Sequence, residues 1–415
     1  MNNSGMIYGI SDRPPFGKLV LFALQMMLSC FTATVLIANV CGVNVSAALV
    51  GAGLSTLVYS FVTKFQSPMT VSNSGAYVAP VLAALTLGGY SAVAIGGLVS
   101  FCVYAIFAFI FSKVGVDAIY RIFPRVLIGS ITVVIGITLM SYIPSYIGEG
   151  QLQLGIALFT VLVIALVSHY CKGVLSLFPF LIGILAGYIV SIPFGLVDFR
   201  TFNNISLFCW PEFAFTKWGA VDFNILPIVV TYIAFSISCM MEVLSDHAAL
   251  SGIVGVDLYR KPGIPRILLG EGVANIFSSS VGALGATSYG EGIATVGFSR
   301  CASIFSSVGS ALIMILLGFL GPVQAFITSI PSCVIGGGTA IILYSYIANS
   351  GIKQLQAVDF KDNKNLLISG IVLSTGISGI VLGGGDFTLS GTALAVVLGI
   401  IFNLILKEKT NNAET

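Results

Sequence analysis

The sequence predicts an all-α protein that crosses a membrane about fourteen times, and three observations carry that prediction. The first is composition: 57% of the 415 residues are hydrophobic, 8% are charged, and the mean hydropathy is +1.03. The second is the distribution of basic residues along the chain. The third is a pair of polar, glycine-rich stretches at corresponding places in the two halves of the chain.

The composition excludes two classes of protein. An average soluble domain is roughly one quarter charged, so this chain has too few charges to coat a soluble surface. Disordered chains lack apolar residues, and this one is rich in them. The net charge of +2 is far from the strongly basic charge of nucleic-acid-binding proteins, so no nucleic-acid partner is expected. The 8 cysteines form no CxxC pair or Cys/His cluster, which predicts no metal site and no disulfide framework.

Apolar runs, broken at charges, prolines and glycines, give the expected membrane segments. Each needs about 20 residues to cross about 30 Å of hydrocarbon. The first seven are expected to start near Lys18, Val45, Pro68, Ser91, Arg125, Leu152 and Val174. The other seven are expected to start near Ile225, Pro265, Thr287, Ala302, Val334, Leu366 and Ser390.

The basic residues predict the orientation of these segments. All but two of the 18 lysines and arginines lie in stretches that the segment count places on one side of the membrane. The exceptions, Arg200 and Lys217, both lie in the longest loop, residues 194–222. Because cytoplasmic loops carry the excess of Lys and Arg, both termini are expected in the cytoplasm. The expected location is the inner, or plasma, membrane.

The long loop divides the chain into two halves of seven expected segments each. Seven is odd, so the second half enters the membrane in the opposite orientation, which is the geometry of inverted repeats in secondary transporters. The first repeat is expected over residues 1–198 and the second over residues 199–415.

The third segment of each half is polar where a lipid-facing helix would be apolar. Residues 67–80 and residues 285–295 are rich in Gly, Ser and Thr. Corresponding interrupted segments in two halves are the best sequence pointer to a substrate site near the midplane of the membrane. An extended stretch followed by a half-helix presents free N–H groups, and Gly75 and Gly290 would let a small, planar, polar ligand approach the backbone closely. The alternative is an ordinary loop between shorter helices.

Four of the 16 acidic residues are expected inside the membrane, namely Glu242, Asp246, Glu271 and Glu291. Burying a charge is expensive, so each is a functional-site hypothesis. Glu242 and Asp246 share one helix face and cannot both ionise easily, which suits proton coupling. Interhelical hydrogen bonding is the alternative for Asp246 and Glu271. His247 points about 100° away from Asp246 around the helix, so a packing role is expected for it.

No enzyme signature is present in the sequence. HExxH, the phosphate-binding Gly-Lys-Ser/Thr loop and the GxSxG elbow are all absent. The chain is therefore expected not to be an enzyme and to carry no cofactor.

Several motifs resemble those of the uracil–xanthine permeases, also called the nucleobase–ascorbate transporters, a family of nucleobase:cation symporters. The resemblance runs from residue 11 to about residue 407. The motifs, in chain order, are Asp12-Arg13-Pro14-Pro15, Ser74-Gly75-Ala76-Tyr77-Val78-Ala79-Pro80, Glu242 with Ser245-Asp246, Arg260-Lys261-Pro262-Gly263, Thr287-Ser288-Tyr289-Gly290-Glu291-Gly292, and Ile330-Pro331-Ser332-Cys333-Val334-Ile335-Gly336-Gly337.

The resemblance implies a core domain and a gate domain. The core would hold segments at about 17–113 and 221–321, and the gate those at about 121–197 and 323–408. Short antiparallel strands in the third and tenth segments would lie at the centre of the core. The core would move against the gate in an elevator-type motion, and the gate would also form a homodimer.

The resemblance also implies roles for individual residues. The implied substrate site consists of Glu242, Glu291, Gly75, Gly290, Ala76, Tyr289 and Ser74. Glu242 and Glu291 would accept N–H groups of a nucleobase, and backbone amides near Gly75 and Gly290 would donate to its carbonyls. The residues implied in proton coupling are Asp246, Glu242 and Glu271. Protons are expected as the coupling ion, with sodium as the alternative.

Four positions depart from the family pattern: Met26 replaces a usual His, Gly75 a common Phe, Ser245 a usual Gly and Gly292 a usual Asn. The missing ring at Gly75 enlarges the site. A nucleobase remains the expected substrate, either uracil or a purine such as hypoxanthine, guanine or xanthine. The alternative function is a sulfate or bicarbonate transporter of the same inverted-repeat fold, against which the acidic site argues.

Overall fold

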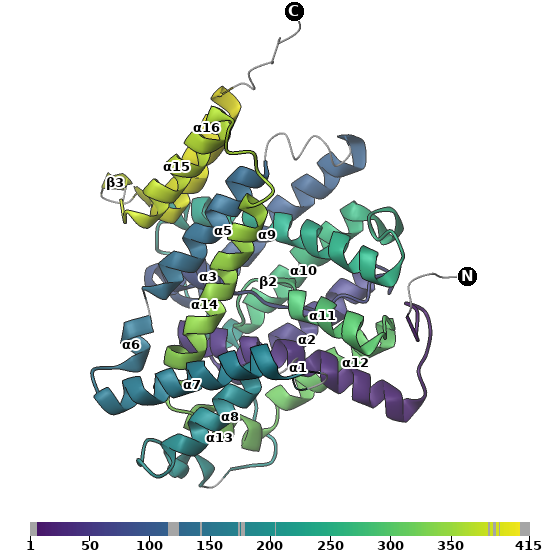
Figure 1. Ribbon diagram of the computed structural model, residues 1–415, viewed down its shortest axis with the longest axis vertical. Helices are drawn as coiled ribbons and strands as arrows, with labels where there is room; N and C mark the ends of the chain where they lie inside the picture. The colour runs from purple at the N-terminus through teal and green to yellow at the C-terminus, as the bar shows by residue number, and fades with distance from the viewer. Residues whose placement is uncertain are drawn as a thin grey trace, which may run out of the picture. The chain divides into compact units, whose positions relative to one another are not determined.

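The computed structural model is mostly helical (Figure 1). It describes residues 6–114, 124–141, 143–172, 175, 179–203, 205–380, 382–384, 387–389 and 391–406. Outside these residues lie two expected segment starts and three of the basic residues behind the predicted orientation: Val174, Ser390, Arg121, Lys407 and Lys409. The chain divides into a first unit, Met1–Ser112 with Tyr142–Leu343, and a second unit, Lys113–Ser141 with Tyr344–Thr415.

The first unit contains most of the helices. Those that begin in it are α1 (Phe16–Cys41), α2 (Val45–Val62), α3 (Val78–Val114), α6 (Ile143–Ile147), α7 (Gln151–Tyr170), α8 (Pro179–Ser191), α9 (Leu226–Val254), α10 (Ile264–Val281), α11 (Gly290–Ser299), α12 (Ile304–Gly318), α13 (Gly321–Ser329) and α14 (Ala340–Leu355). Its short helical turns are η1 (Gly75–Tyr77), η3 (Phe199–Phe202), η4 (Ala214–Lys217), η5 (Tyr259–Gly263) and η6 (Cys333–Thr339). Its strands are β1 (Val71–Asn73) and β2 (Ala286–Ser288).

Six helical stretches of the described chain are long and apolar enough to cross a membrane, and a bent pair of helices, Gly321–Ser329 with Cys333–Ile342, makes a seventh if it counts as one span. Three shorter helices are also apolar: Pro179–Ser191, Ile304–Gly318 and Leu394–Ile405. The protein is therefore a multi-pass membrane protein, as its composition predicts. The count of about fourteen segments stays a prediction.

The two polar stretches are both followed by a half-helix that ends in a turn. Helix α3 is interrupted at Gly88 and Gly89, and Gly89 has a φ of +60°, which favours glycine. The break falls where the sequence predicts a boundary, close to Ser91. Helix α11 ends at Arg300, also with a positive φ of 54°, before α12 begins. Each half-helix thus leads into a second helix through a break at a residue with positive φ.

Strands β1 and β2 form the centre of the first unit. They pair antiparallel, with Val71 opposite Ser288 and Asn73 opposite Ala286, and every residue of both strands is buried. The short antiparallel strands that the family resemblance implied are therefore present.

Each strand is held by one polar side chain from a neighbouring helix. Thr56 Oγ1 on α2 donates to Val71 O at 2.7 Å and accepts from Val71 N at 3.0 Å. On α10, Asn275 Nδ2 donates to Ala286 O at 2.8 Å and its Oδ1 accepts from Ala286 N at 3.0 Å. These bonds satisfy backbone groups that the two-stranded ladder leaves unpaired, at a depth where no water is available.

We expect Thr56→Val to destabilise the protein by about 1–3 kcal/mol, because it leaves a buried N–H and a buried C=O of β1 without a partner. Thr56→Ser keeps the hydroxyl and should stay close to the wild type. Thermal unfolding in detergent, with both variants side by side, measures the difference. Equal unfolding temperatures for the two variants would contradict the role assigned to the hydroxyl.

Small residues let the helices of the first unit pack closely. A Cβ at Gly51 of α2 would collide with Ala283 after α10, and a Cβ at Gly53 would collide with Ala311 and Ile315 of α12. Small residues at helix crossings are typical of membrane proteins, because packing rather than hydrophobicity holds helices together in lipid. The close packing of α2 against α10 and α12 fixes the frame in which both strands sit.

The second unit comprises α5 (Arg125–Met140), most of α14, α15 (Asn363–Ile377), α16 (Gly391–Ile405) and the strands β3 (Leu382–Gly384) and β4 (Phe387–Leu389). Helix α5 packs against α15 and α16, and Ser130 Oγ donates to Ser369 Oγ at 3.0 Å. Strands β3 and β4 pair antiparallel. The sequence analysis expected no strands there.

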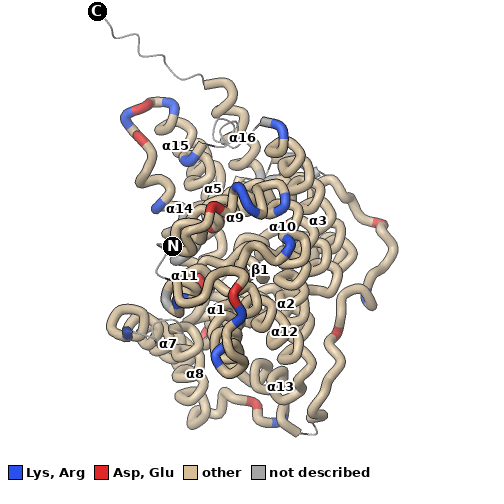
Figure 2. Tube along the Cα trace, turned by 90° about the vertical axis from the view of Figure 1, so that its right-hand side faces the viewer, with Lys and Arg blue, Asp and Glu red and all other residues tan. Residues whose placement is uncertain are grey.

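Charged residues are sparse along the chain, and the positions coloured in Figure 2 lie mostly at helix ends and in connecting segments. The long loop carries one of the described ion pairs, in which Lys217 Nζ lies 2.6 Å from Glu212 Oε2. The hydrogen bond to Glu212 raises the pKa of Lys217 above its usual value. This pairing balances the charge of one of the two basic residues that the predicted orientation places outside.

Candidate functional site

The candidate site is built on the pair β1–β2. Two further backbone bonds extend the ladder, from Tyr289 N to Thr70 O at 3.1 Å and from Ser74 N to Gly285 O at 2.9 Å. Because the strands are antiparallel, η1 with α3 begins at one end of the ladder and α11 begins at the other. The two expected half-helices therefore start within one hydrogen-bonded element.

The two half-helix starts differ in how open they are. Ser74 Oγ accepts a bond from Ala76 N at 3.2 Å, so that amide already has a partner. Gly290 is exposed, and no atom lies within 4 Å of the position that a Cβ would occupy. Tyr289 is mostly buried and its hydroxyl donates to Asn73 O at 3.0 Å. The first turn of α11 is therefore the end at which a ligand can approach free N–H groups.

Helix α9 runs past both ends of the ladder. Ser236 lies 3.4 Å from the Tyr77 hydroxyl of η1, and Asp246 Oδ2 accepts a bond from Ser288 Oγ of β2 at 2.9 Å. Glu242 lies between these two contacts on the same helix, and its side chain is exposed. A ligand bound at Glu242 therefore has both half-helix starts nearby.

The exposed carboxylates belong to one cluster. Glu291 lies in the first turn of α11, which packs against α9. Glu242 interacts electrostatically with Glu291, and Asp246 interacts with both. The structure thus brings together Glu242 and Glu291, which the resemblance assigns to the base, and Asp246, one of the three residues that it assigns to proton coupling.

Glu271 lies apart from any exposed surface. It is completely buried on α10, and neither carboxylate oxygen has a hydrogen-bond partner among the described side chains, although the backbone of Ser288 is close to it. It interacts electrostatically with Asp246 and Glu242. Its position suits the holding of a proton rather than contact with a ligand.

No cation neutralises this cluster within the described residues. The two described ion pairs, Lys217 with Glu212 and Arg260 with Asp257, involve none of the four carboxylates. Carboxylates clustered at membrane depth without cations need protons or N–H donors. The site therefore presents acceptors to a ligand that carries donors.

Sequence reasoning missed the residues that support the site. The motif that contains Ser288 indicates no role for it, yet Ser288 donates to Asp246, and no motif contains Thr56 or Asn275. The available signal was their position, because Thr56 and Asn275 lie in the second segment of each expected repeat. A comparison of the two halves would have paired them.

Comparison with known proteins gives one consistent result. A model of a permease family matches residues 17–383. The uracil permease of Bacillus caldolyticus is 35% identical, with 98% of this chain and 96% of the relative covered. The uracil permease of Bacillus subtilis is 32% identical over 100% and 99%, and that of Escherichia coli is 33% identical over 96% and 94%.

Solved structures share the fold at low identity. The transmembrane domain of the cyanobacterial bicarbonate transporter BicA matches with a TM-score of 0.65 and 16% identity, covering 95% of this chain and 99% of that chain. SLC26A9 matches with a TM-score of 0.69 and 14% identity, covering 93% of this chain and 64% of that chain. The fold is therefore that of these transporters, and the sequence relatives decide the family. The chain belongs to the permease family of xanthine and uracil permeases, and it is a transporter rather than an enzyme.

Proposed function

We propose that the protein takes up a nucleobase together with protons. The observation that carries this proposal is the cluster of Glu242, Glu291, Asp246 and Glu271 beside the paired strands β1 and β2, without a described cation beside it. Relatives named uracil permease over nearly the whole chain support a nucleobase as the substrate.

A nucleobase matches the chemistry of the site. It is small and planar, its ring N–H groups suit the carboxylates of Glu242 and Glu291, and its carbonyls suit the free amides at Gly290. Gly75 provides no ring that would stack on the base, so the site has room for a purine as well as for uracil. Hypoxanthine, guanine and xanthine are the purines that we include in the proposal.

The acidic cluster also suits proton coupling. Asp246 is tied to β2 through Ser288, so a change in its charge acts directly on the strand that leads to Gly290. Glu271 lies behind that strand and interacts with Asp246. Protons, rather than sodium, are the proposed coupling ion because carboxylate pairs without a carbonyl cage favour them.

We further propose the finer architecture that the sequence predicts, with about fourteen segments in two inverted repeats, 1–198 and 199–415. The matching strands, half-helix turns and polar anchors at Thr56 and Asn275 support it. The proposal includes a core domain that moves against a gate domain, a homodimer, and both termini on the cytoplasmic side of the inner membrane.

The second candidate is anion transport, because the structural matches are a bicarbonate transporter and SLC26A9, which is described as an anion transporter. Those proteins are 16% and 14% identical and indicate the fold alone. An anion at this site would face Glu242 and Glu291 without a described cation to offset the repulsion. The nucleobase is therefore the better fit.

A thermal-shift panel separates the two candidates. A ligand at 100 times its Kd stabilises the folded state by about 2.7 kcal/mol, so binding appears as a higher unfolding temperature. The purified protein should be stabilised by uracil or by one of hypoxanthine, guanine and xanthine, and not by sulfate or bicarbonate. Stabilisation by an anion with none by any base would support the second candidate.

A further inference from the structure

His247 belongs to a hydrogen-bonded cluster between α9 and α2 that the substrate site does not use. His247, Tyr59 and Ser67 are all completely buried. The Tyr59 hydroxyl lies 2.5 Å from His247 Nε2 and 2.9 Å from Ser67 Oγ. On its other side, His247 Nδ1 lies 2.7 Å from Val243 O. The packing role expected for His247 accounts for its burial, but not for this chain of polar atoms.

The number of protons in this cluster is not fixed by its geometry. Val243 O only accepts, so Nδ1 carries a proton, whereas the Tyr59 hydroxyl has one proton for two neighbours. When Tyr59 donates to Ser67 Oγ, the Tyr59 oxygen can only accept a hydrogen bond from His247. Nε2 must then carry a proton as well as Nδ1, so His247 is an imidazolium. When His247 is neutral, Tyr59 donates to Nε2 instead. The same three side chains therefore have two bonded arrangements that differ by one proton.

The middle residue of the cluster, Tyr59, lies next to the acidic site. Glu271 of α10 interacts electrostatically with Tyr59, and no hydrogen-bond partner for its oxygens lies among the described side chains. The tyrosine ring packs directly on Gly270, where a Cβ would lie 2.9 Å from Tyr59 Cδ2. Glycine at this position allows the close approach of α2 and α10. Tyr59 is thus a neighbour of Glu271.

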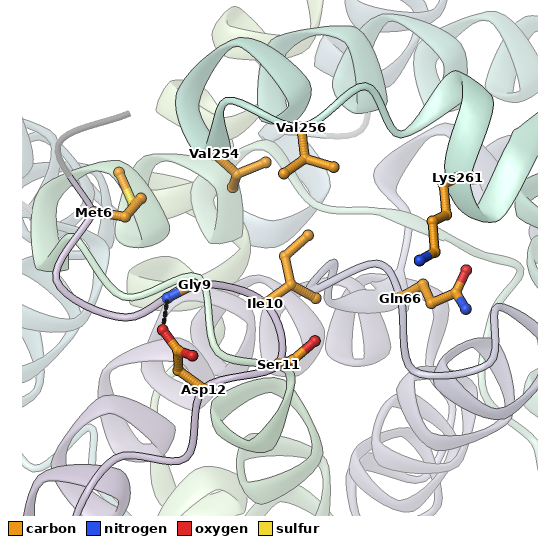
Figure 3. Close-up of a pocket in the computed structure, with 9 residues that line it drawn as sticks. All are labelled: Met6, Gly9, Ile10, Ser11, Asp12, Gln66, Val254, Val256 and Lys261. Atoms are coloured by element: carbon orange, nitrogen blue, oxygen red, sulfur yellow. Dashed lines mark hydrogen bonds between the residues drawn. The ribbon is translucent and has the colours of Figure 1, made fainter. Parts of the chain in front are cut away.

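A cavity of about 450 Å³ lies beside Gln66, the neighbour of Ser67 in the chain (Figure 3). Ser67 follows Gln66, which lines the cavity and whose Oε1 is buried without a described partner. The cavity is lined by Met6, Gly9, Ile10, Ser11, Asp12, Gln66, Val254, Val256 and Lys261. It has room for several water molecules and polar groups to hold them. The expected orientation places these residues on the cytoplasmic side.

We propose that His247, Tyr59 and Ser67 form a proton relay between the buried carboxylates and this cavity. The proposal rests on the proposed function, because it supplies the path by which a proton carried with the nucleobase leaves. Titratable or charged groups around the relay are Tyr59 itself from α2, Glu271 from α10, Asp246 beside His247 on α9, and Asp12 and Lys261 at the cavity.

The relay moves one proton in two stages. In the first, the Glu271 carboxyl, which interacts electrostatically with Tyr59 but is not hydrogen-bonded to it in this structure, turns towards Tyr59 and gives its proton to the Tyr59 oxygen. At the same time the Tyr59 O–H proton passes to His247 Nε2, which leaves a carboxylate and an imidazolium. In the second, Nε2 returns its proton to the Tyr59 oxygen, the Tyr59 proton passes to Ser67 Oγ, and the Ser67 proton passes to water in the cavity. Both His247 and Tyr59 end neutral, and no other reactant is consumed.

Two variants test the relay in proteoliposomes. Tyr59→Phe removes the central hydroxyl and keeps the ring, and His247→Gln keeps a polar side chain that cannot carry the proton. We expect exchange of labelled uracil at equal pH to stay within about twofold of wild type. Accumulation driven by a pH gradient, and acidification of an internal dye, should fall about 100-fold, as expected for loss of a proton-transfer group. Tyr232→Phe is the matched control, because Tyr232 is equally buried and its hydroxyl has no described partner.

Each outcome decides the proposal. Wild-type accumulation in both variants would overturn it. Loss of exchange together with accumulation would also overturn it, and so would loss of stabilisation by uracil, because either result would indicate a structural role only. A wild-type protein that exchanges uracil without moving protons would overturn the relay and leave nucleobase transport standing. A wild-type protein that exchanges none of uracil, hypoxanthine, guanine and xanthine would instead reject the proposed function.

Discussion

Glu242→Gln and Glu291→Gln should each abolish uptake of the nucleobase at micromolar concentration. Each change keeps the shape of the side chain and removes a charged acceptor at the open end of the strand ladder. A hydrogen bond to a charged group is worth about 1.5–3 kcal/mol, so each variant should bind the base about 10- to 100-fold more weakly. Isothermal titration of purified protein measures the affinity, and uptake of labelled base by cells measures transport.

Glu149→Gln is the matched control for these variants. Glu149 is exposed and precedes α7, away from the strands, so the same chemical change there should leave binding and uptake unchanged. Wild-type affinity in both Glu242→Gln and Glu291→Gln would contradict the assigned site. A loss in all three variants would indicate a general loss of folded protein, which ligand-free thermal unfolding detects.

Asp246→Asn should uncouple transport from protons. The asparagine Oδ1 still accepts the bond from Ser288 Oγ, so the strand geometry is retained, but the side chain carries neither charge nor exchangeable acid. We expect exchange of labelled base across the membrane to continue while accumulation against a gradient is lost. Paired assays of exchange and of pH-driven accumulation in proteoliposomes measure the two activities.

Asp257→Asn makes the same chemical change at an exposed residue that pairs with Arg260. Because exposed ion pairs contribute little, this variant should behave like the wild type in both assays. Full accumulation by Asp246→Asn would show that another group carries the proton, and Glu271 would then be the first residue to test.

The sequence predicts much of this fold because the membrane imposes strict rules on composition. Few charges, long apolar runs and a sided distribution of basic residues follow from the lipid environment itself. The polar stretches at 67–80 and 285–295 could be found because irregular backbone at membrane depth is tolerated only where it is buried in protein or lines a cavity. The structure confirms that both contain a short strand followed by a half-helix.

Other parts of the fold leave no comparable trace. The register that sets Val71 opposite Ser288 depends on polar anchors from α2 and α10, which lie 15 and 11 residues before the strand residues that they hold. The pair β3–β4 lies in a glycine-rich stretch between α15 and α16 that reads as a connecting loop. Both features are set by tertiary contacts rather than by local periodicity.

The sequence names candidate residues for the site but not how deeply each one lies. Glu242 and Glu291 are exposed in the structure, whereas Glu271 is completely buried. A helical sequence gives the face on which a carboxylate lies, and the covering of that face by β2 decides whether a ligand reaches it. For the same reason the bond between Tyr59 and His247 could not be foreseen, since 188 positions separate them.

The most direct test of the central claim is uracil accumulation in proteoliposomes with an internal pH dye, under a proton gradient directed inward. The account predicts that labelled uracil, or a purine base in its place, accumulates above the external concentration and that the interior acidifies only when the base is present. Accumulation that needs sodium would contradict proton coupling. Transport of bicarbonate or sulfate with no movement of any base would contradict the account as a whole.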